Sequence, residues 1–222
     1  MKKFVLVSIL TGALALMFCG CHFVGGGVQG SGVRKTEKRD LVTFKSIESD
    51  GAFEIQVTCQ KPLSVEIEGD DNILPLIKTE VRDGVLHIGS PKAYSARQPV
   101  SVRIALPSLE SIANNGAGKV QVSNLKNDAF EIHSMGATSL NAAGQTKSVK
   151  IETSGAGKID TSDLHAEKAE VSISGAASVD VYATEQLDVN VSGVGRVTYS
   201  GNPKTVNKNV SGVGSVSAKG GS

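Results

Sequence analysis

The segment Ser154-Gly155-Ala156-Gly157-Lys158-Ile159 decides the fold, because its pattern returns at almost constant spacing along the chain. The other copies lie at residues 115–120, 135–140, 174–179, 192–197 and 211–216. Their first glycines follow one another after 20, 19, 20, 18 and 19 residues. Six copies in one frame indicate a repeat architecture, in which each copy is one structural unit stacked on the next.

The length of the repeat favours one coil of a β-helix with about 19–20 residues per coil. Extended residues advance about 3.3 Å each, so one copy traces a circuit of roughly 60 Å. Folded into about three sides, that circuit stacks on the next one at the inter-strand spacing of about 4.8 Å. The composition agrees, because 25 glycines, no tryptophan and 4% aromatic residues suit a narrow core of small side chains.

Two aliphatic columns support the stacking. Four residues after each first glycine stand Val120, Leu140, Ile159, Val179, Val197 and Val216. Four residues before it stand Ile112, Ile132, Ile151, Val171, Val189 and finally Lys208. If successive copies are coils, members of one column touch and form the core. The glycine then marks a corner that needs an unusual dihedral angle or a close approach of two backbones.

Other repeat folds fit the pattern less well. A propeller blade needs about 40 residues, and leucine-rich repeats need several leucines per copy. An antiparallel meander in which two strands share one period remains an alternative to the coil.

The flanking regions do not follow the repeat. Residues 41–110 alternate apolar and polar side chains, which is typical of half-buried strands, and would cover or form the N-terminal coils. At the other end Pro203, Lys204, Lys208 and Lys219 are expected to protect the exposed edge of the last coil.

The first residues form a targeting segment. Lys2 and Lys3 precede a mostly apolar stretch that ends at Gly20-Cys21, which resembles a bacterial lipoprotein signal with Cys21 as the lipidated residue. An ordinary secretory signal beside an unrelated cysteine is the alternative. The predicted organisation is a signal peptide at 1–20, a lipidated Cys21 with a flexible tether to residue 40, and a domain at 41–222.

Charge and motifs exclude several functions. Beyond Lys2 and Lys3 the chain has 21 basic and 22 acidic residues, which gives no electrostatic basis for nucleic-acid binding. The four histidines show no metal-ligand spacing, and the pair Glu131 and His133 is typical of a solvated strand face. Cys59 lies in an alternating strand and is expected to be a buried thiol. We therefore predict no catalytic residues, no metal and no cofactor.

One column and its neighbour offer a weak binding face. Lys119, Lys158 and Arg196 recur in one column on alternate coils, and Asp160 and Asp180 stand two places further along. Such a strip could meet a glycan or a protein, although solvated charges spaced to limit repulsion are the simpler explanation.

A family resemblance lies in residues 44–47, 51–57, 63–75, 81–88 and 106–112 and in the Ser-Gly-Ala/Val-Gly repeats, and it spans about residues 41–217. On these segments the chain resembles the bacterial family named putative auto-transporter adhesin, head GIN domain. The resemblance implies a right-handed parallel β-helix in an exported, often lipid-anchored protein, with no established catalytic residues to carry over.

We therefore predict a non-catalytic binding or adhesion scaffold that is attached to the membrane by lipid. Its partner would be a glycan or a surface protein, and it could form homo-oligomers. His22 after Cys21, in place of aspartate, points to the outer membrane. A carbohydrate-active enzyme on a β-helix and a structural or oligomerising envelope element are the alternatives.

Overall fold

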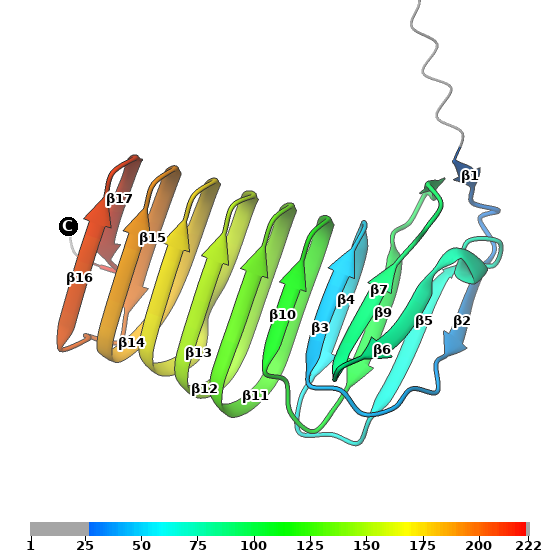
Figure 1. The fold of residues 1–222 in the computed structure, drawn as a ribbon, viewed down its shortest axis with the longest axis horizontal. Helices are drawn as coiled ribbons and strands as arrows, with labels where there is room; N and C mark the ends of the chain where they lie inside the picture. Colours follow the sequence, from blue (N-terminus) through cyan, green and yellow to red (C-terminus); the bar gives the residue numbers. More distant parts are fainter. Residues whose placement is uncertain (1–26, 221–222) are drawn as a thin grey trace, which may run out of the picture.

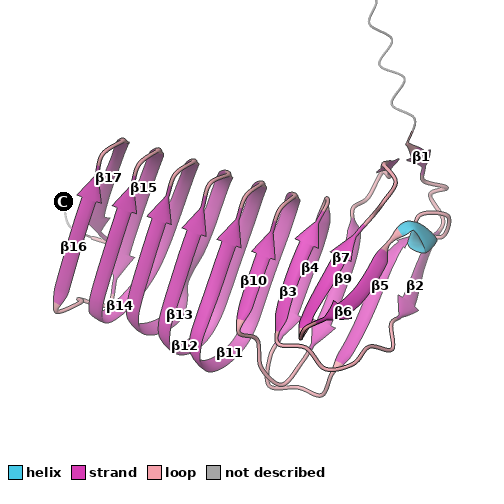
Figure 2. Cartoon of the chain, viewed as in Figure 1, coloured by secondary structure: helices cyan, strands magenta, loops and turns pink. Residues whose placement is uncertain are grey.

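The structure is a computed structural model that describes residues 27–220, and 70% of this part is β-strand (Figures 1 and 2). The strands before the repeats are β1 (Val28–Gln29), β2 (Arg34–Lys38), β3 (Ser46–Asp50), β4 (Phe53–Thr58), β5 (Ser64–Asp70), β6 (Lys78–Arg82), β7 (Val85–Gly89), β8 (Tyr94–Ser95) and β9 (Val100–Ala105). The later ones are β10 (Ser111–Asn114), β11 (Ala117–Ser134), β12 (Ala137–Thr153), β13 (Ala156–Ile173), β14 (Ala176–Val191), β15 (Val194–Ser200), β16 (Thr205–Val210) and β17 (Val213–Ala218). A 3₁₀ turn, η1 (Leu74–Leu76), lies between β5 and β6. Within the described residues no helix has the length and apolar character needed to cross a membrane.

The strands wind into a right-handed parallel β-helix of about five turns. In Figure 1 the strands in front run upwards and those behind run downwards while the chain advances from right to left, which defines a right-handed coil. Each repeat contributes two long sides and a short third one, as the pairing of β11 with β12 over residues 117–122, 125–127 and 129–134 shows. We call the side that contains β3, β10 and β16 the front wall, and the side that contains β4, β15 and β17 the back wall.

The strand register confirms the stacked columns. Val120 pairs with Leu140, and the column continues through Ile159 and Val179 to Val197 and Val216. The second column runs in register from Ile112 to Lys208 on the front wall. Because all these pairings are parallel, the antiparallel meander is wrong.

The core consists of these columns. From Val120 to Val197 every member of the first column is at most 1% exposed, and only Val216, in the last coil, is partly exposed. Burying one such side chain fully stabilises the fold by roughly 1.5–3 kcal/mol. The repeated sequence therefore produces a continuous core, to which each wall contributes one layer of side chains.

The first glycine of each copy is required by a close approach between neighbouring corners. At Gly155 a Cβ atom would overlap the carbonyl oxygen of Gly136, and at Gly136 it would overlap that of Gly116. These overlaps are with backbone, which cannot swing away. Of the two reasons expected for the corner glycine, close approach is the one that applies at these positions.

The region before the repeats forms two more coils and a cover, but not in chain order. On the front wall β3 lies between β7 and β10, and on the back wall β4 lies between β9 and β11. The chain thus builds the β3–β4 layer first and then adds β7 and β9 outside it. Beyond these layers, β5 pairs antiparallel with β9, β2 with β5, and β6 with β7.

The predicted flexible tether up to residue 40 is wrong over residues 28–38. There β1 pairs with β8 and β2 pairs with β5 over Arg34–Lys38, so this segment belongs to the domain. Its glycine-rich composition hid the strands, whose ordering depends on partners at least 28 residues away in the sequence. The signal peptide and Cys21 lie outside the described residues.

The C-terminal end differs from the covered N-terminal end. Within the described residues β16 and β17 have no strand on their outer sides. Lys208, which takes the last place of an aliphatic column, is exposed; its ammonium donates to the carbonyl of Val216 at 3.1 Å and lies 5.1 Å from the ring centre of Tyr199. This arrangement agrees with the expected edge protection.

Candidate binding surfaces

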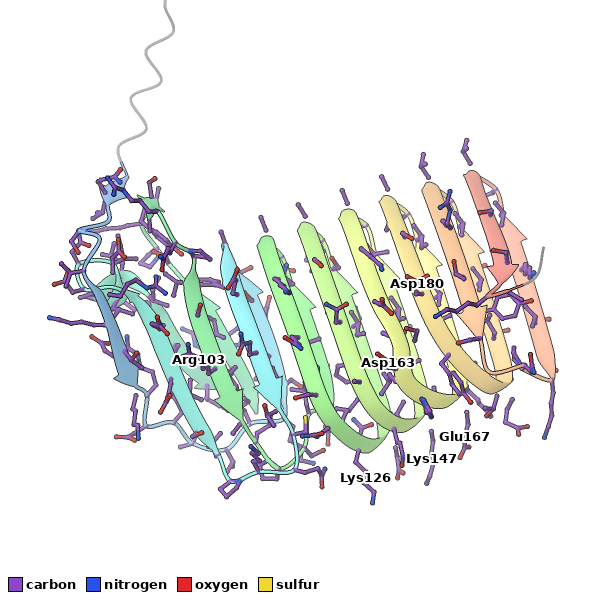
Figure 3. The ribbon with its side chains drawn as sticks, turned by 180° about the vertical axis from the view of Figure 1, so that it is seen from behind. Arg103, Lys126, Lys147, Asp163, Glu167 and Asp180 are labelled. Atoms are coloured by element: carbon purple, nitrogen blue, oxygen red, sulfur yellow. The ribbon has the colours of Figure 1, made fainter. Side chains whose placement is uncertain are left out.

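The predicted polar strip lies on the outside of the back wall. Lys119, Lys158 and Arg196 share one register column, with Ser139 and Ser178 between them. Asp160 and Asp180 are direct neighbours in the next outward column; Figure 3 marks Asp180 on its strand.

The structure brings three of these five side chains together. The ammonium of Lys158 lies 3.3 Å from a carboxylate oxygen of Asp160 and 3.3 Å from one of Asp180. Hydrogen bonds with Asp160 and then Asp180 raise the pKa of Lys158. Lys119 and Arg196 stand two strands to either side and form no ion pair among the described residues. The strip is therefore one compact charge cluster with a separate cation on each side.

Partial burial raises the pKa of Asp160, because it disfavours the charged carboxylate, but other contacts lower that pKa by more. The hydroxyl of Ser162 donates to Asp160 at 2.7 Å, its backbone N–H donates at 3.2 Å, and Lys158 adds its charge. Together they hold the pKa of Asp160 below its usual range. The carboxylate is thus kept ionised for pairing and is unsuited to proton donation at neutral pH.

Sequence reasoning missed a hollow on the short third side of the coils. It has a volume of about 680 Å³, opens widely to solvent, and is bordered by the bends of β11 to β14. The rings of His165 and Tyr182 stack inside its border, 4.5 Å apart and 13° from parallel. Figure 3 shows Lys126, Lys147 and Glu167 projecting from the same edge. Lys126, Gln145 and His165 share a register column, but their chemistry differs, so a search for recurring residue types did not group them.

The front wall carries His87 and His133. His133 lies 3.4 Å from Glu131 and 3.1 Å from Glu152, and His87 lies 3.1 Å from Glu48. All five side chains are substantially exposed. Across residues 27–220 no group of three or more histidine, cysteine, aspartate or glutamate side chains is arranged to hold a metal ion.

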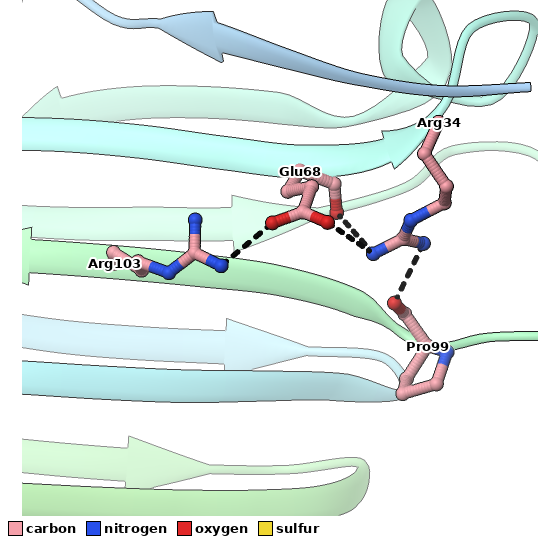
Figure 4. Close-up of polar contacts among 4 residues, drawn as sticks. All are labelled: Arg34, Glu68, Pro99 and Arg103. Atoms are coloured by element: carbon pink, nitrogen blue, oxygen red, sulfur yellow. Dashed lines mark hydrogen bonds and ion pairs between the residues drawn. The ribbon is translucent and has the colours of Figure 1, made fainter.

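A charge network fastens the lead-in strand β2 to the N-terminal cover (Figure 4). Glu68 lies between Arg103, at 2.6 Å, and Arg34, at 3.4 Å, and Arg34 also donates to the carbonyl of Pro99. The hydrogen bond from Arg103, helped by Arg34, lowers the pKa of Glu68. This network links β2, β5 and β9 and acts as a structural clamp.

Cys59 is a buried thiol, as expected. It is 0% exposed, and burial raises its pKa to about 11. A thiol with that pKa is almost fully protonated at neutral pH and is a poor nucleophile.

Together these features define a class of protein: a parallel β-solenoid whose polar side chains lie on open outer walls and in shallow surface hollows. The sequence of the chain matches the family named putative auto-transporter adhesin, head GIN domain, over residues 43–143 and 132–203. The chain belongs to this family, which indicates a surface or exported protein.

Solved structures agree with the fold. A crystal structure described as a putative adhesin from Bacteroides fragilis is 26% identical and covers 87% of this chain and all of its own, with a TM-score of 0.70. A putative adhesin from Parabacteroides distasonis is 21% identical, covers 86% of this chain and 99% of its own, and has a TM-score of 0.60. A protein from the same species described as a putative lipid binding protein is 18% identical, covers 86% and 99%, and has a TM-score of 0.55. Comparison with curated proteins found no match.

Proposed function

We propose that this protein is a lipid-anchored envelope protein whose solenoid presents its outer walls for adhesion to a glycan or a surface protein, without catalysing a reaction. The proposal rests on one combination of observations. The chain belongs to the family named above, and the charged side chains on its repetitive outer walls pair with one another. Among the described residues the ionisable groups are spread over two walls and a short side, whereas catalysis needs them to converge on one reacting atom.

The proposed anchor and the observed fold suit each other. Only six residues separate Cys21 from Val28, the first residue of β1. Fully extended, the chain from Cys21 to Val28 spans at most about 25 Å. A chain lipidated at Cys21 would therefore hold the N-terminal end of the solenoid close to the membrane, and the outer membrane is the proposed location.

The hollow on the short third side suits a carbohydrate better than the charged strip does. It combines the aromatic pair of His165 and Tyr182 with amide and hydroxyl groups, including those of Gln145 and Thr184. Sugars are commonly held by an aromatic surface together with a few polar groups that fix their orientation. The cluster of Lys158 with Asp160 and Asp180 would instead suit a charged protein surface.

The anchor is tested by mass spectrometry of the N-terminal peptide of the mature protein. We expect Cys21 to be the first residue and to carry the mass of a lipid. A mature N-terminus at any other residue, or an unmodified Cys21, would overturn the anchor. Cells that produce Cys21→Ser should release the protein from the membrane fraction.

Adhesion is tested with the full mature chain, purified in detergent, on an array of envelope and host glycans. Tyr182→Ala should weaken binding to glycans that the wild type retains, whereas Lys168→Ala, on the front wall, should leave it unchanged. Retention of no glycan and no surface protein would refute the adhesion role. Shortened glycans after incubation would favour the carbohydrate-active enzyme instead.

A further inference from the structure

The C-terminal end of the solenoid presents two unpaired strand edges. In the described part of the chain, β16 pairs only with β14, and β17 pairs only with β15. Figure 1 shows both strands at the left-hand limit of the rod. The outer backbone N–H and C=O groups of such strands are ready to pair with a further extended segment.

This end also has a uniform charge. After Asp188 the chain contains Arg196, Lys204, Lys208 and Lys219 and no aspartate or glutamate. Lys204 pairs with Glu185 of the preceding coil at 2.7 Å, whereas Lys219 forms no ion pair among the described residues. The last coil is therefore basic, although the chain as a whole is nearly neutral.

Apolar side chains are exposed at the same end. Val194 and Val213 are register neighbours and are 60% and 73% exposed, and Val210 of β16 is 41% exposed. Val216 of β17 is only partly buried, because no further coil within residues 27–220 covers it. A strand added to this edge would remove part of this apolar surface from water.

We propose that this end binds an acidic, extended polypeptide segment of another protein, which adds as a strand to the edge of β16 or β17. The backbone edge supplies the hydrogen bonds, the valines supply apolar contact, and Lys208 and Lys219 select for carboxylates. The proposal concerns a different surface from the strip and the hollow, and it depends on neither lipid anchoring nor glycan binding.

A second copy of this chain suits the same edge less well. Contact between two C-terminal ends would place Lys208 and Lys219 of one copy near those of the other, and like charges at that distance repel. Edge lysines commonly protect strands from pairing with identical strands. The same lysines attract a strand of opposite charge. They therefore favour an acidic partner while they limit aggregation of the chain.

The test uses the full mature chain in detergent and two labelled peptides. One alternates valine with glutamate, and the other alternates valine with lysine. Fluorescence anisotropy should show binding of the glutamate peptide alone, weakening as salt is raised. Hydrogen exchange should show new protection confined to residues 205–218.

Charge reversal then locates the site. Lys219→Glu should weaken binding of the glutamate peptide about fivefold or more. Lys126→Glu, the same change on the short third side, should leave binding unaltered. Lys208→Glu should act like Lys219→Glu, but Lys208 also contacts Val216 and Tyr199, so Lys219→Glu decides the matter if the Lys208 variant misfolds.

Three results would overturn the proposal. Equal binding of both peptides would show that the edge does not select for carboxylates. Hydrogen-exchange protection outside residues 205–218 would show that the peptide binds elsewhere. Sedimentation showing that the chain alone associates through this end, so that the peptide cannot bind, would assign the edge to a second copy.

Discussion

The two ends of this solenoid solve the problem of an exposed coil in different ways. At the N-terminal end the chain departs from the repeat: β2, β5 and β6 run antiparallel to their neighbours, and Leu74 of η1 is 0% exposed among the buried core residues. At the C-terminal end the repeat continues to its last described coil, where Lys208 replaces an aliphatic residue. Repetition thus builds the rod, and changes to the sequence are needed wherever a coil lacks a neighbour.

The largest expected effect compares a corner inside the rod with a corner at its open end. Gly155→Ala places a Cβ atom on the carbonyl oxygen of Gly136, with coils on both sides preventing relief. We expect it to lower the free energy of unfolding by about 3 kcal/mol or more. Gly212→Ala makes the same overlap with Gly193, but the last coil can separate locally, so we expect about 1 kcal/mol or less.

Urea unfolding followed by circular dichroism measures both changes. Gly84→Ala is the control, because Gly84 has φ +77° but open space around its Cβ position, so it should show only the backbone cost of about 1–2 kcal/mol. Equal effects of Gly155→Ala and Gly212→Ala would show that the last coil is as firmly held as the interior.

The next comparison concerns the two ends of the core. Leu74→Ala removes a fully buried side chain from the N-terminal cover and should lower the free energy of unfolding by about 2–5 kcal/mol. Val216→Ala removes a partly exposed side chain at the open end and should lower it by about 1 kcal/mol or less. Thermal unfolding of the two variants measures the difference, and a larger effect at Val216 would contradict the contrast between the ends.

The repeat allowed the middle of the rod to be predicted almost residue by residue. A fixed period places Val120 beside Leu140 whatever the rest of the chain does, so the core columns followed from spacing alone. The N-terminal end could not be predicted in this way, because the insertion of β3 between β7 and β10 depends on contacts between distant, non-repeating segments.

The candidate surfaces were harder to predict than the fold. The spacing of Lys158, Asp160 and Asp180 was enough to place them near one another. The stack of His165 and Tyr182 was not predicted, because the bend between Thr161 and Ala166 shifts the register there. Such irregularities follow from local packing and leave no periodic signal in the sequence.

A pH dependence is expected at the N-terminal end. The pKa of Glu68 is lower in the fold than its ordinary value of 4.5, chiefly through the hydrogen bond from Arg103. Its contribution to stability is therefore complete above that value and is lost as the pH falls through the lower, folded-state pKa. Glu68→Gln should flatten the loss of stability below pH 4.5 by a small amount, because the pair is partly solvated.

The measurement is thermal unfolding across the acidic range. Glu66→Gln, on the same strand, is the matched control, since the ion pair of Glu66 within residues 27–220 is a long one, to Lys38 at 3.8 Å, and should matter less. Identical acid profiles for the wild type and Glu68→Gln would show that the clamp on β2 contributes nothing through charge.

The smallest expected effect on stability sharpens the contrast at the open end. Lys208→Val restores the aliphatic column below Val189 but loses the contacts of Lys208 with Val216 and Tyr199. Since the new side chain packs on one side only, we expect the free energy of unfolding to change by about 0.5 kcal/mol or less.

Self-association should rise instead, because a valine at an unpaired edge no longer repels a second copy. Sedimentation velocity at several protein concentrations would detect it, and Lys126→Val is the control for loss of one positive charge elsewhere. If Lys208→Val stays as monomeric as the wild type, Lys208 is not what keeps this edge from pairing with a second copy.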